Sequence, residues 1–426
     1  MKRFKITFLL TSIWCLCHLP LAAGESESDT NSLADLDDAI AYGISHNPGI
    51  LAAWQQYQAA LEKIPQAKGL PDPRLMVNHF VEEIETRTGP QRNQVFLTQM
   101  IPWFGKLRLR GEVASKEAEA IHHAYEARIL MLTRDISIAW YEYAYLGKST
   151  EITRQNLDLL KRLEDTVREK VRAGNDLAPL LRLEVELAKA QDMLQGMEKQ
   201  RLSQSAALNA LLGRESTEPI SWPDLPEPVD RRMDRESLKE ELLAGNPELC
   251  ALQSRIEKAE GTLELSKRSP IPDPMIGAGI FDTGESVMPN QADSGNDPWA
   301  IQLSFSIPLW SGKYKAEKRE AEAGYEAARQ SRTDRENTLV AELESALQKL
   351  SEIDQRLDLY SDTLLPKAKQ AVEVTESSYR ADRASLLDVI DSERTQLEIE
   401  RTYWRAVADH HQSMVRLQTL TGETKP

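Results

Sequence analysis

Apolar residues recur at alternating spacings of three and four along two long stretches of the chain. They are Ile129, Leu132, Ile136, Ala139, Tyr143 and Leu146 in the first stretch, and Leu339, Leu343, Ala346, Leu350, Ile353, Leu357, Tyr360 and Leu364 in the second. This seven-residue rhythm is typical of helices that pack side by side as coiled coils. The pattern predicts two long helices, one beginning near Trp103 and one near Leu309.

Each long helix is expected to end in a turn and to be followed by a returning helix. The first turn is placed at Gly174 and the second at Asp382, where the apolar rhythm breaks. The rhythm resumes after the first turn at Leu180, Leu183, Leu187, Ala190, Leu194 and Met197. The sequence therefore predicts two antiparallel helical hairpins, and a continuous helix from Trp103 to Gly174 would be roughly 100 Å long.

Four short runs are instead predicted to be β-strands, at residues 74–81, 94–101, 275–281 and 299–307. In the last run one face carries only apolar residues: Ile301, Leu303, Phe305 and Ile307. The other face carries small or polar residues: Ala300, Gln302, Ser304 and Ser306. Such alternation predicts a strand with one apolar and one polar side. Residues 282–298 are rich in Gly, Asp, Asn and Ser and are predicted to form a long exposed loop.

Short motifs occur twice in the same order, displaced by about 200 residues. The pairs are Asn47-Pro48 with Asn246-Pro247, Pro71-Asp72-Pro73 with Pro272-Asp273-Pro274, Ile101-Pro102 with Ile307-Pro308, Gly105-Lys106 with Gly312-Lys313, and Leu208 and Gly213 with Leu417 and Gly422. The chain is therefore interpreted as two copies of one unit, residues 24–220 and 230–426, with a proline-rich linker at 221–229. Each unit should begin with a helical segment, 33–68 or 234–267, that ends at its Pro-Asp-Pro.

The N-terminus has the layout of a secretory signal peptide. Lys2, Arg3 and Lys5 precede an apolar stretch, and the small residues Ala22 and Ala23 end it. Residues 1–23 are accordingly predicted to be removed on export. No later stretch approaches the roughly 18 to 20 apolar residues of a membrane-spanning helix, so any membrane contact would have to be made by strands.

Charge narrows the class of protein further. The formal net charge of the 426 residues is −15, with 52 Lys and Arg against 67 Asp and Glu, which disfavours a nucleic-acid partner.

Four strands are too few to close a barrel, and open strand edges inside lipid would leave backbone groups without partners. Three chains would supply 12 strands, and the same symmetry would assemble the hairpins into a hollow cylinder. The predicted fold is thus mainly α, with a trimeric 12-stranded β-barrel on an α-helical tunnel.

The order of these motifs resembles the TolC-like outer membrane efflux proteins over essentially the whole mature chain. The most specific match is residues 378–391, Ser-Tyr-Arg-Ala-Asp-Arg-Ala-Ser-Leu-Leu-Asp-Val-Ile-Asp, which resemble the family's hairpin turn at the periplasmic tip. Pro-Trp-Phe-Gly-Lys at 102–106 and Leu-Pro-Asp-Pro at 70–73 resemble the heavy-metal efflux branch in particular. The resemblance implies passive transport through an exit duct that crosses the outer membrane and the periplasm. It further implies a homotrimer, a periplasmic adaptor (membrane fusion protein) and an inner-membrane pump of the resistance-nodulation-division type.

The resemblance also assigns roles at the tip. It places two acidic rings of a pore constriction at Asp388 and Asp391, which share one helix face because they lie three residues apart. Tyr379 matches a tyrosine of the closing network, whereas the family's arginine falls at Ala384, so that latch is either missing or moved to Arg383. The family's usual turn glycine falls at Asp382. The alternative for Asp388 and Asp391 is that they are ordinary solvated carboxylates.

Other candidate chemistry is weaker. His122-His123 and His410-His411 are adjacent pairs whose side chains should point about 100° apart on a helix, so neither pair is expected to chelate one ion. Cys250 is predicted to be a small buried residue. No catalytic, metal or cofactor motif is found, and an enzyme is not expected. The competing interpretation is a wholly periplasmic coiled-coil adaptor or scaffold. Such a protein would be purified without detergent, whereas a membrane duct would require it.

Overall fold

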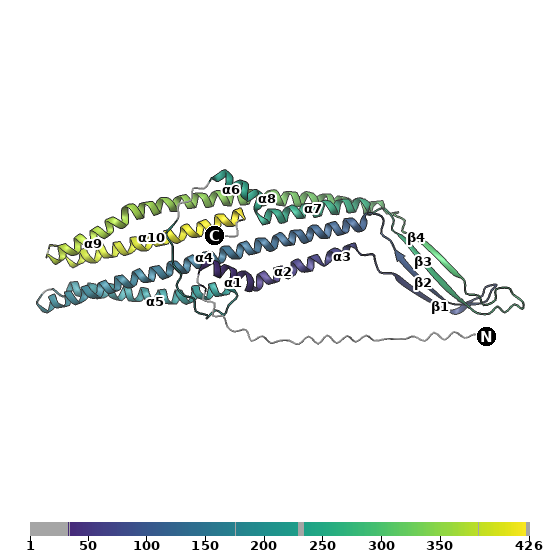
Figure 1. Cartoon of the computed structure of the whole chain (residues 1–426), viewed down its shortest axis with the longest axis horizontal. Helices are drawn as coiled ribbons and strands as arrows, with labels where there is room; N and C mark the ends of the chain where they lie inside the picture. The colour runs from purple at the N-terminus through teal and green to yellow at the C-terminus, as the bar shows by residue number, and fades with distance from the viewer. Residues whose placement is uncertain (1–32, 34, 175, 229–233, 382, 423–426) are drawn as a thin grey trace.

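The computed structural model describes residues 33, 35–174, 176–228, 234–381 and 383–422. The predicted signal peptide and Asp382 lie outside these residues. The molecule is long and narrow, with a four-stranded sheet at one end and two helical hairpins at the other (Figure 1). Among the described residues, no helix is both long enough and apolar enough to cross a membrane.

The first hairpin follows the apolar rhythm of the sequence. Helix α4 (Lys106–Arg172) has 67 residues, about 100 Å, and α5 (Ala178–Leu212) returns along it. Predicted contact residues such as Leu132, Ile136 and Leu183 are buried at their interface or against α1. The first of the two predicted hairpins is therefore confirmed.

The second hairpin has an interruption that the apolar rhythm did not reveal. Helix α8 (Ser311–Leu359) passes through a π-helical turn, η1 (Tyr360–Leu364), into α9 (Leu365–Arg380), and α10 (Leu386–Thr421) returns. Pro366 lies in the first turn of α9 and lacks the amide that an unbroken α-helix would use. The prediction of one uninterrupted helix to residue 381 was wrong at this point.

The predicted helical segment before each Pro-Asp-Pro consists of more than one helix. The first forms α1 (Leu36–His46), α2 (Pro48–Leu61) and α3 (Lys63–Lys68), and the second forms α6 (Arg235–Gly245) and α7 (Pro247–Arg268). Asn47 and Asn246 have extended backbones because each precedes a proline. Each asparagine side chain caps the next helix, and Asn47 Oδ1 accepts from the Gly49 amide at 2.8 Å.

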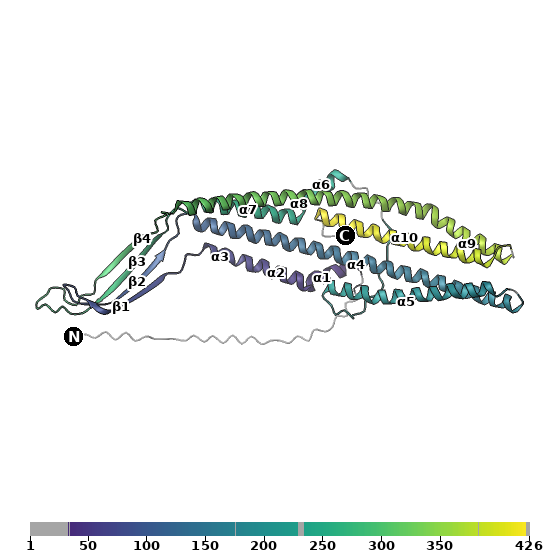
Figure 2. The ribbon, with the colours of Figure 1, turned by 180° about the vertical axis from the view of Figure 1, so that it is seen from behind.

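The sheet combines both halves of the chain in the order β1-β2-β3-β4, with antiparallel neighbours throughout. The strands are β1 (Arg74–Ile84), β2 (Gln91–Met100), β3 (Pro274–Thr283) and β4 (Trp299–Phe305). Because β2 pairs with β3, the first unit joins the second at the centre of the sheet. Strands β1 and β4 form its two edges (Figures 1 and 2).

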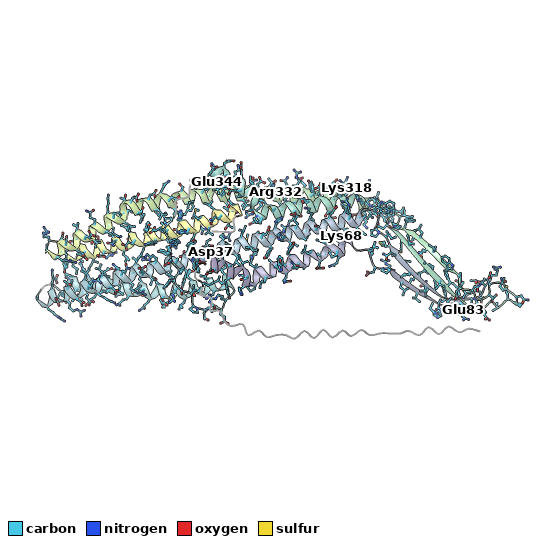
Figure 3. The ribbon with its side chains drawn as sticks, viewed as in Figure 1. Asp37, Lys68, Glu83, Lys318, Arg332 and Glu344 are labelled. Carbon is cyan, nitrogen blue, oxygen red and sulfur yellow. The ribbon has the colours of Figure 1, made fainter. Side chains whose placement is uncertain are left out.

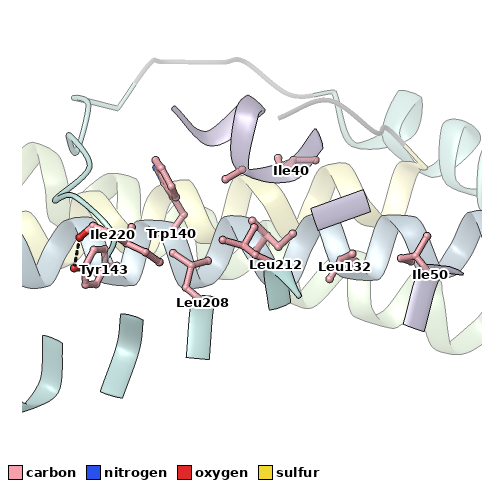
Figure 4. Packing of buried hydrophobic residues seen from close by; sticks show 10 residues of the cluster. Ile40, Ile50, Leu132, Trp140, Tyr143, Leu208, Leu212 and Ile220 are labelled. Carbon is pink, nitrogen blue, oxygen red and sulfur yellow. Dashed lines mark hydrogen bonds between the residues drawn. The ribbon is translucent and has the colours of Figure 1, made fainter. Parts of the chain in front are cut away.

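The proline-rich linker is fixed to the middle of the helical part. Tyr143 on α4 is buried, and its hydroxyl donates to the Ile220 carbonyl at 3.0 Å beside the apolar cluster of α1, α4 and α5 (Figure 4). The ring of Trp222 stacks on Tyr143 at 4.6 Å between centroids. The start of the linker is thus packed against α4 at Trp222.

Candidate channel tip and membrane-facing strands

The two hairpin turns lie at the same end of the molecule, opposite the sheet (Figure 1). Gly174, at the first turn, has a φ of +98°, which L-residues with a side chain rarely adopt. Its amide donates to the Val171 carbonyl at 3.0 Å, closing the end of α4. The sequence therefore has glycine where the backbone requires it.

The second turn leads directly into a well-capped helix. Ser385 caps α10 with a reciprocal capping box, in which the Asp388 carboxylate accepts from the Ser385 amide at 2.9 Å and from its hydroxyl at 2.8 Å. The hydrogen bond from the Ser385 hydroxyl has the largest effect on the pKa of Asp388. Together with the bond from the Ser385 amide, it holds that pKa below its usual range. Asp388 is therefore ionised and held in place at neutral pH.

Asp391 lies one helical turn after Asp388 on α10. Its side chain is 79% exposed, and the Arg394 guanidinium reaches to 3.9 Å of it. Both carboxylates are exposed at the start of α10, beside the turn. The sequence thus places two acidic side chains one above the other at the tip, and their role in a constriction stays a prediction.

Tyr379 and Arg383, the two candidates for the closing network, lie on either side of the second turn. Tyr379 packs beside the apolar cluster of the hairpins, and the Lys170 ammonium lies 4.5 Å from its ring centroid. Arg383 is exposed, and its backbone amide donates to the Ser378 carbonyl at 2.8 Å. Tyr379 thus contacts the first hairpin, and a role for either residue in closing stays a prediction.

The apolar face of β4 is exposed, as its alternation predicted. Ile301, Leu303, Phe305 and Ile307 are between 55% and 74% exposed, and Ile307 lies just beyond the strand's last residue. The register continues this face across the sheet: Leu75 lies opposite Leu97, Leu97 opposite Ala278, and Ala278 opposite Ile301. A whole exposed apolar face on one sheet is a surface for lipid or for another chain.

Sequence reasoning missed Glu393, a buried carboxyl between the two hairpins. Glu393 on α10 is 6% exposed, and burial, together with Glu376 and Glu400, raises its pKa to about 7. It lines a cavity of about 340 Å³ with Leu160, Ala190 and other residues of the first hairpin. Nothing near Glu393 in the sequence could reveal this burial, because the residues that cover it come from the other half of the chain.

The pair His122-His123 differs from expectation. Both rings turn toward Glu126 one helical turn on, with His123 Nδ1 at 2.7 Å and His122 Nδ1 at 3.6 Å from its carboxylate oxygens. One donor atom from each of these residues lies within 4.8 Å of the others, so the trio could hold a metal ion. The expected divergence of the two adjacent histidines is not seen here, because both rings turn toward the third residue, Glu126. Cys250 is half-buried rather than buried, and burial raises the pKa of its thiol.

This geometry is that of the outer membrane efflux proteins. The model of that family matches residues 43–214 and 238–423, and the chain belongs to it. The chain is 20% identical over 397 residues to the cobalt-zinc-cadmium resistance protein CzcC of Cupriavidus metallidurans, covering 91% of this chain and 90% of CzcC. It is 22% identical over 328 residues to the pyoverdine export outer membrane protein OpmQ of Pseudomonas putida, covering 76% of this chain and 68% of OpmQ.

Solved structures show the same fold. The outer membrane protein VceC of Vibrio cholerae superimposes with a TM-score of 0.74 at 19% identity, covering 92% of this chain and 97% of VceC. The predicted family, fold class and location in the outer membrane are thereby confirmed. The protein is an outer membrane exit duct of an efflux system, and its family and fold are those of a passive channel.

Proposed function

We propose that the chain is one subunit of a homotrimeric duct in which three four-stranded sheets close into one 12-stranded barrel. The observation that carries this proposal is the sheet itself, which has an exposed apolar face and two edge strands, β1 and β4. An edge strand in lipid leaves amides and carbonyls without partners at several kcal/mol each. Pairing β4 of one copy with β1 of the next satisfies these groups and leaves only the apolar face toward lipid.

We further propose that the hairpin tips meet a periplasmic adaptor and that a pump of the resistance-nodulation-division type supplies the energy. The two units, with borders at 24–220 and 230–426, would then give each subunit two hairpins in the tunnel wall. The relative CzcC is named for resistance to cobalt, zinc and cadmium. This likeness supports heavy-metal cations as the exported substrates.

In the same proposal, Asp388 and Asp391 form two acidic rings at the narrow end of the duct. Their position at the start of α10, beside the turn, supports this role. Three copies would bring six carboxylates toward one axis, and the potential there would attract cations and repel anions. The tip would then select by charge as well as by size.

The mass of the mature protein in detergent tests the trimer. Multi-angle light scattering should give about 140 kDa for protein extracted from outer membranes. A detergent-solubilised monomer would contradict the duct. A protein that stays soluble after membranes are removed would instead favour the periplasmic scaffold that the sequence left open.

A further inference from the structure

An ion pair at the junction between sheet and helices links the first unit to the second. The Lys106 ammonium at the start of α4 donates to Asp273 Oδ1 at 2.9 Å and to the Ile271 carbonyl at 2.6 Å. The Trp103 amide donates to the same carboxylate oxygen at 2.7 Å. Lys106 is only 5% exposed, so its charge depends on these partners.

The duplication supplies the same two motifs a second time, but within one chain they do not meet. Asp72 lies in the first Pro-Asp-Pro, before β1, and Lys313 lies in the second Gly-Lys, after β4. Both residues are exposed, and the Asp72 carboxylate has no hydrogen bond or ion pair among the described residues. The labelled Lys68 and Lys318, which are near them in the sequence, lie on opposite sides of the molecule (Figure 3).

We propose that Lys313 of one subunit pairs with Asp72 of the neighbouring subunit and repeats there the contact of Lys106 with Asp273. The inference rests on the proposed trimer and names the contact that joins its copies. In the ring of subunits, a junction within a chain would then alternate with a junction between chains. The occupant of each open sheet edge is accordingly a second copy of this chain.

The helices next to the sheet also indicate a neighbouring subunit, because α8 is less covered than α4. Helix α4 packs against α2 and α3 of its own unit and against α7 of the other, and it has buried residues from Lys106 and Leu109 onward. Helix α8 packs against α7 of its own unit, and it has no buried residue before Leu339. By the duplication, α2 and α3 of the neighbouring subunit would cover this uncovered part of α8.

The duplication also fixes a strand register for the contact. At the junction of β2 with β3, Gln99 lies opposite Ile276. Aligning Ile101-Pro102 with Ile307-Pro308, and the two Pro-Asp-Pro motifs with each other, places Phe305 opposite Leu75 of the neighbour. By the same alignment Leu303 lies opposite Val77.

This register agrees with the exposed face, which was not used to derive it. Leu75, Val77, Leu303 and Phe305 are between 55% and 67% exposed. Residues directly opposite each other on antiparallel strands point to the same side of the sheet. A slip of one residue would place Leu303 and Phe305 opposite Arg74, Met76 or Asn78, which lie on the other face of β1, so the apolar face would no longer be continuous.

The two Gly-Lys motifs differ in one detail that affects how far the lysine side chain must extend to meet the aspartate. Lys106 is the fourth residue after Pro102, whereas Lys313 is the fifth after Pro308. Lys106 begins α4, and Lys313 is already the third residue of α8. The flexible four-carbon stem of lysine and its three donors can accommodate such an offset, which the rigid fork of an arginine would not.

Disulfide cross-linking tests the register in the full-length protein in outer membranes. The variant Leu75→Cys with Phe305→Cys, in a Cys250→Ser background, should give covalent dimers and trimers on non-reducing gels, because directly opposite residues lie within disulfide range. The matched control Gln99→Cys with Ile276→Cys should give only covalent monomers, since that pair lies within one chain. The pair Leu75→Cys with Leu303→Cys, a slip of two residues, should lose most of the covalent trimer.

Charge reversal tests the ion pair. Asp72→Lys or Lys313→Asp alone should lower the temperature at which the trimer dissociates in detergent, and the two together should restore it. Stronger cross-linking of the 75–303 pair than of the 75–305 pair would overturn the inference while the trimer stands. So would a double charge reversal that is no more stable than the single ones. A wild-type protein without any trimer would instead overturn the proposed function.

Discussion

Glu393 is a single carboxyl whose protonation should be visible in the stability of the protein. The unfolded chain ionises it near pH 4.5, and the folded protein near pH 7. Between these values the folded state binds the proton more tightly, so the free energy of unfolding should fall as the pH rises from about 4.5 to about 7. Glu393→Gln should remove this part of the pH dependence and stabilise the protein above pH 7.

Thermal unfolding followed by circular dichroism between pH 4.5 and 8 measures this effect. Glu398→Gln, an exposed carboxyl on the same helix, is the matched control and should leave the profile as it is. An identical pH profile for Glu393→Gln and the wild type would show that the Glu393 carboxyl is ionised in the folded protein.

Two glycines separate backbone strain from packing. Gly174 and Gly196 both have open space where a Cβ would be added, but only Gly174 has a positive φ. Gly174→Ala should destabilise the first hairpin by about 1 kcal/mol or more, because an L-residue is strained there. Gly196→Ala, within α5, should stabilise it by about 0.5 to 1 kcal/mol. Denaturant unfolding of both variants measures the difference, and equal effects would contradict the assigned turn geometry.

At the scale of the element, β4 should tolerate charge on one face only. Leu303→Arg should hinder assembly into the outer membrane by about 2 to 4 kcal/mol if the residue lies near the bilayer midplane. Ser304→Arg, the neighbouring position on the opposite face, should assemble normally. Membrane fractionation with trimer content as the readout compares them, and equal loss in both variants would mean that the strand orientation is wrong.

Local periodicity predicted most of the elements, because each hairpin and strand carries its own apolar pattern. Leu183 and Ile353 were identified as contact residues from spacing alone, and both are fully buried. The breaks were missed where one side chain decides them, as at Asn47, whose cap starts a new helix. The burial of Glu393 could not be predicted, since it depends on a hairpin that is distant in the sequence.

At the scale of the whole molecule, the acidic tip should determine ion selectivity. Asp388→Asn with Asp391→Asn keeps the size of both side chains and removes their charge. Reconstituted channels should lose cation preference and their block by trivalent metal ions, because the ring of negative potential is gone. Single-channel conductance in asymmetric salt measures the preference.

Ser385→Ala separates the charge at the tip from the helix cap. This variant removes the hydroxyl that holds Asp388 but keeps both carboxylates. It should retain cation preference while destabilising the start of α10 by about 1 kcal/mol. Unchanged selectivity and block in the double asparagine variant would return both aspartates to the role of solvated surface residues.

The pairing of β2 with β3 has a consequence for the order of events during export. Met100 lies opposite Met275, so the centre of the sheet cannot form until most of the polypeptide has emerged. A lone β1–β2 hairpin is marginally stable, and closing so long a loop is entropically costly and slow. Membrane insertion is therefore a late step that requires the second half of the chain. A product truncated before β3 should remain in the periplasm and be degraded by proteases.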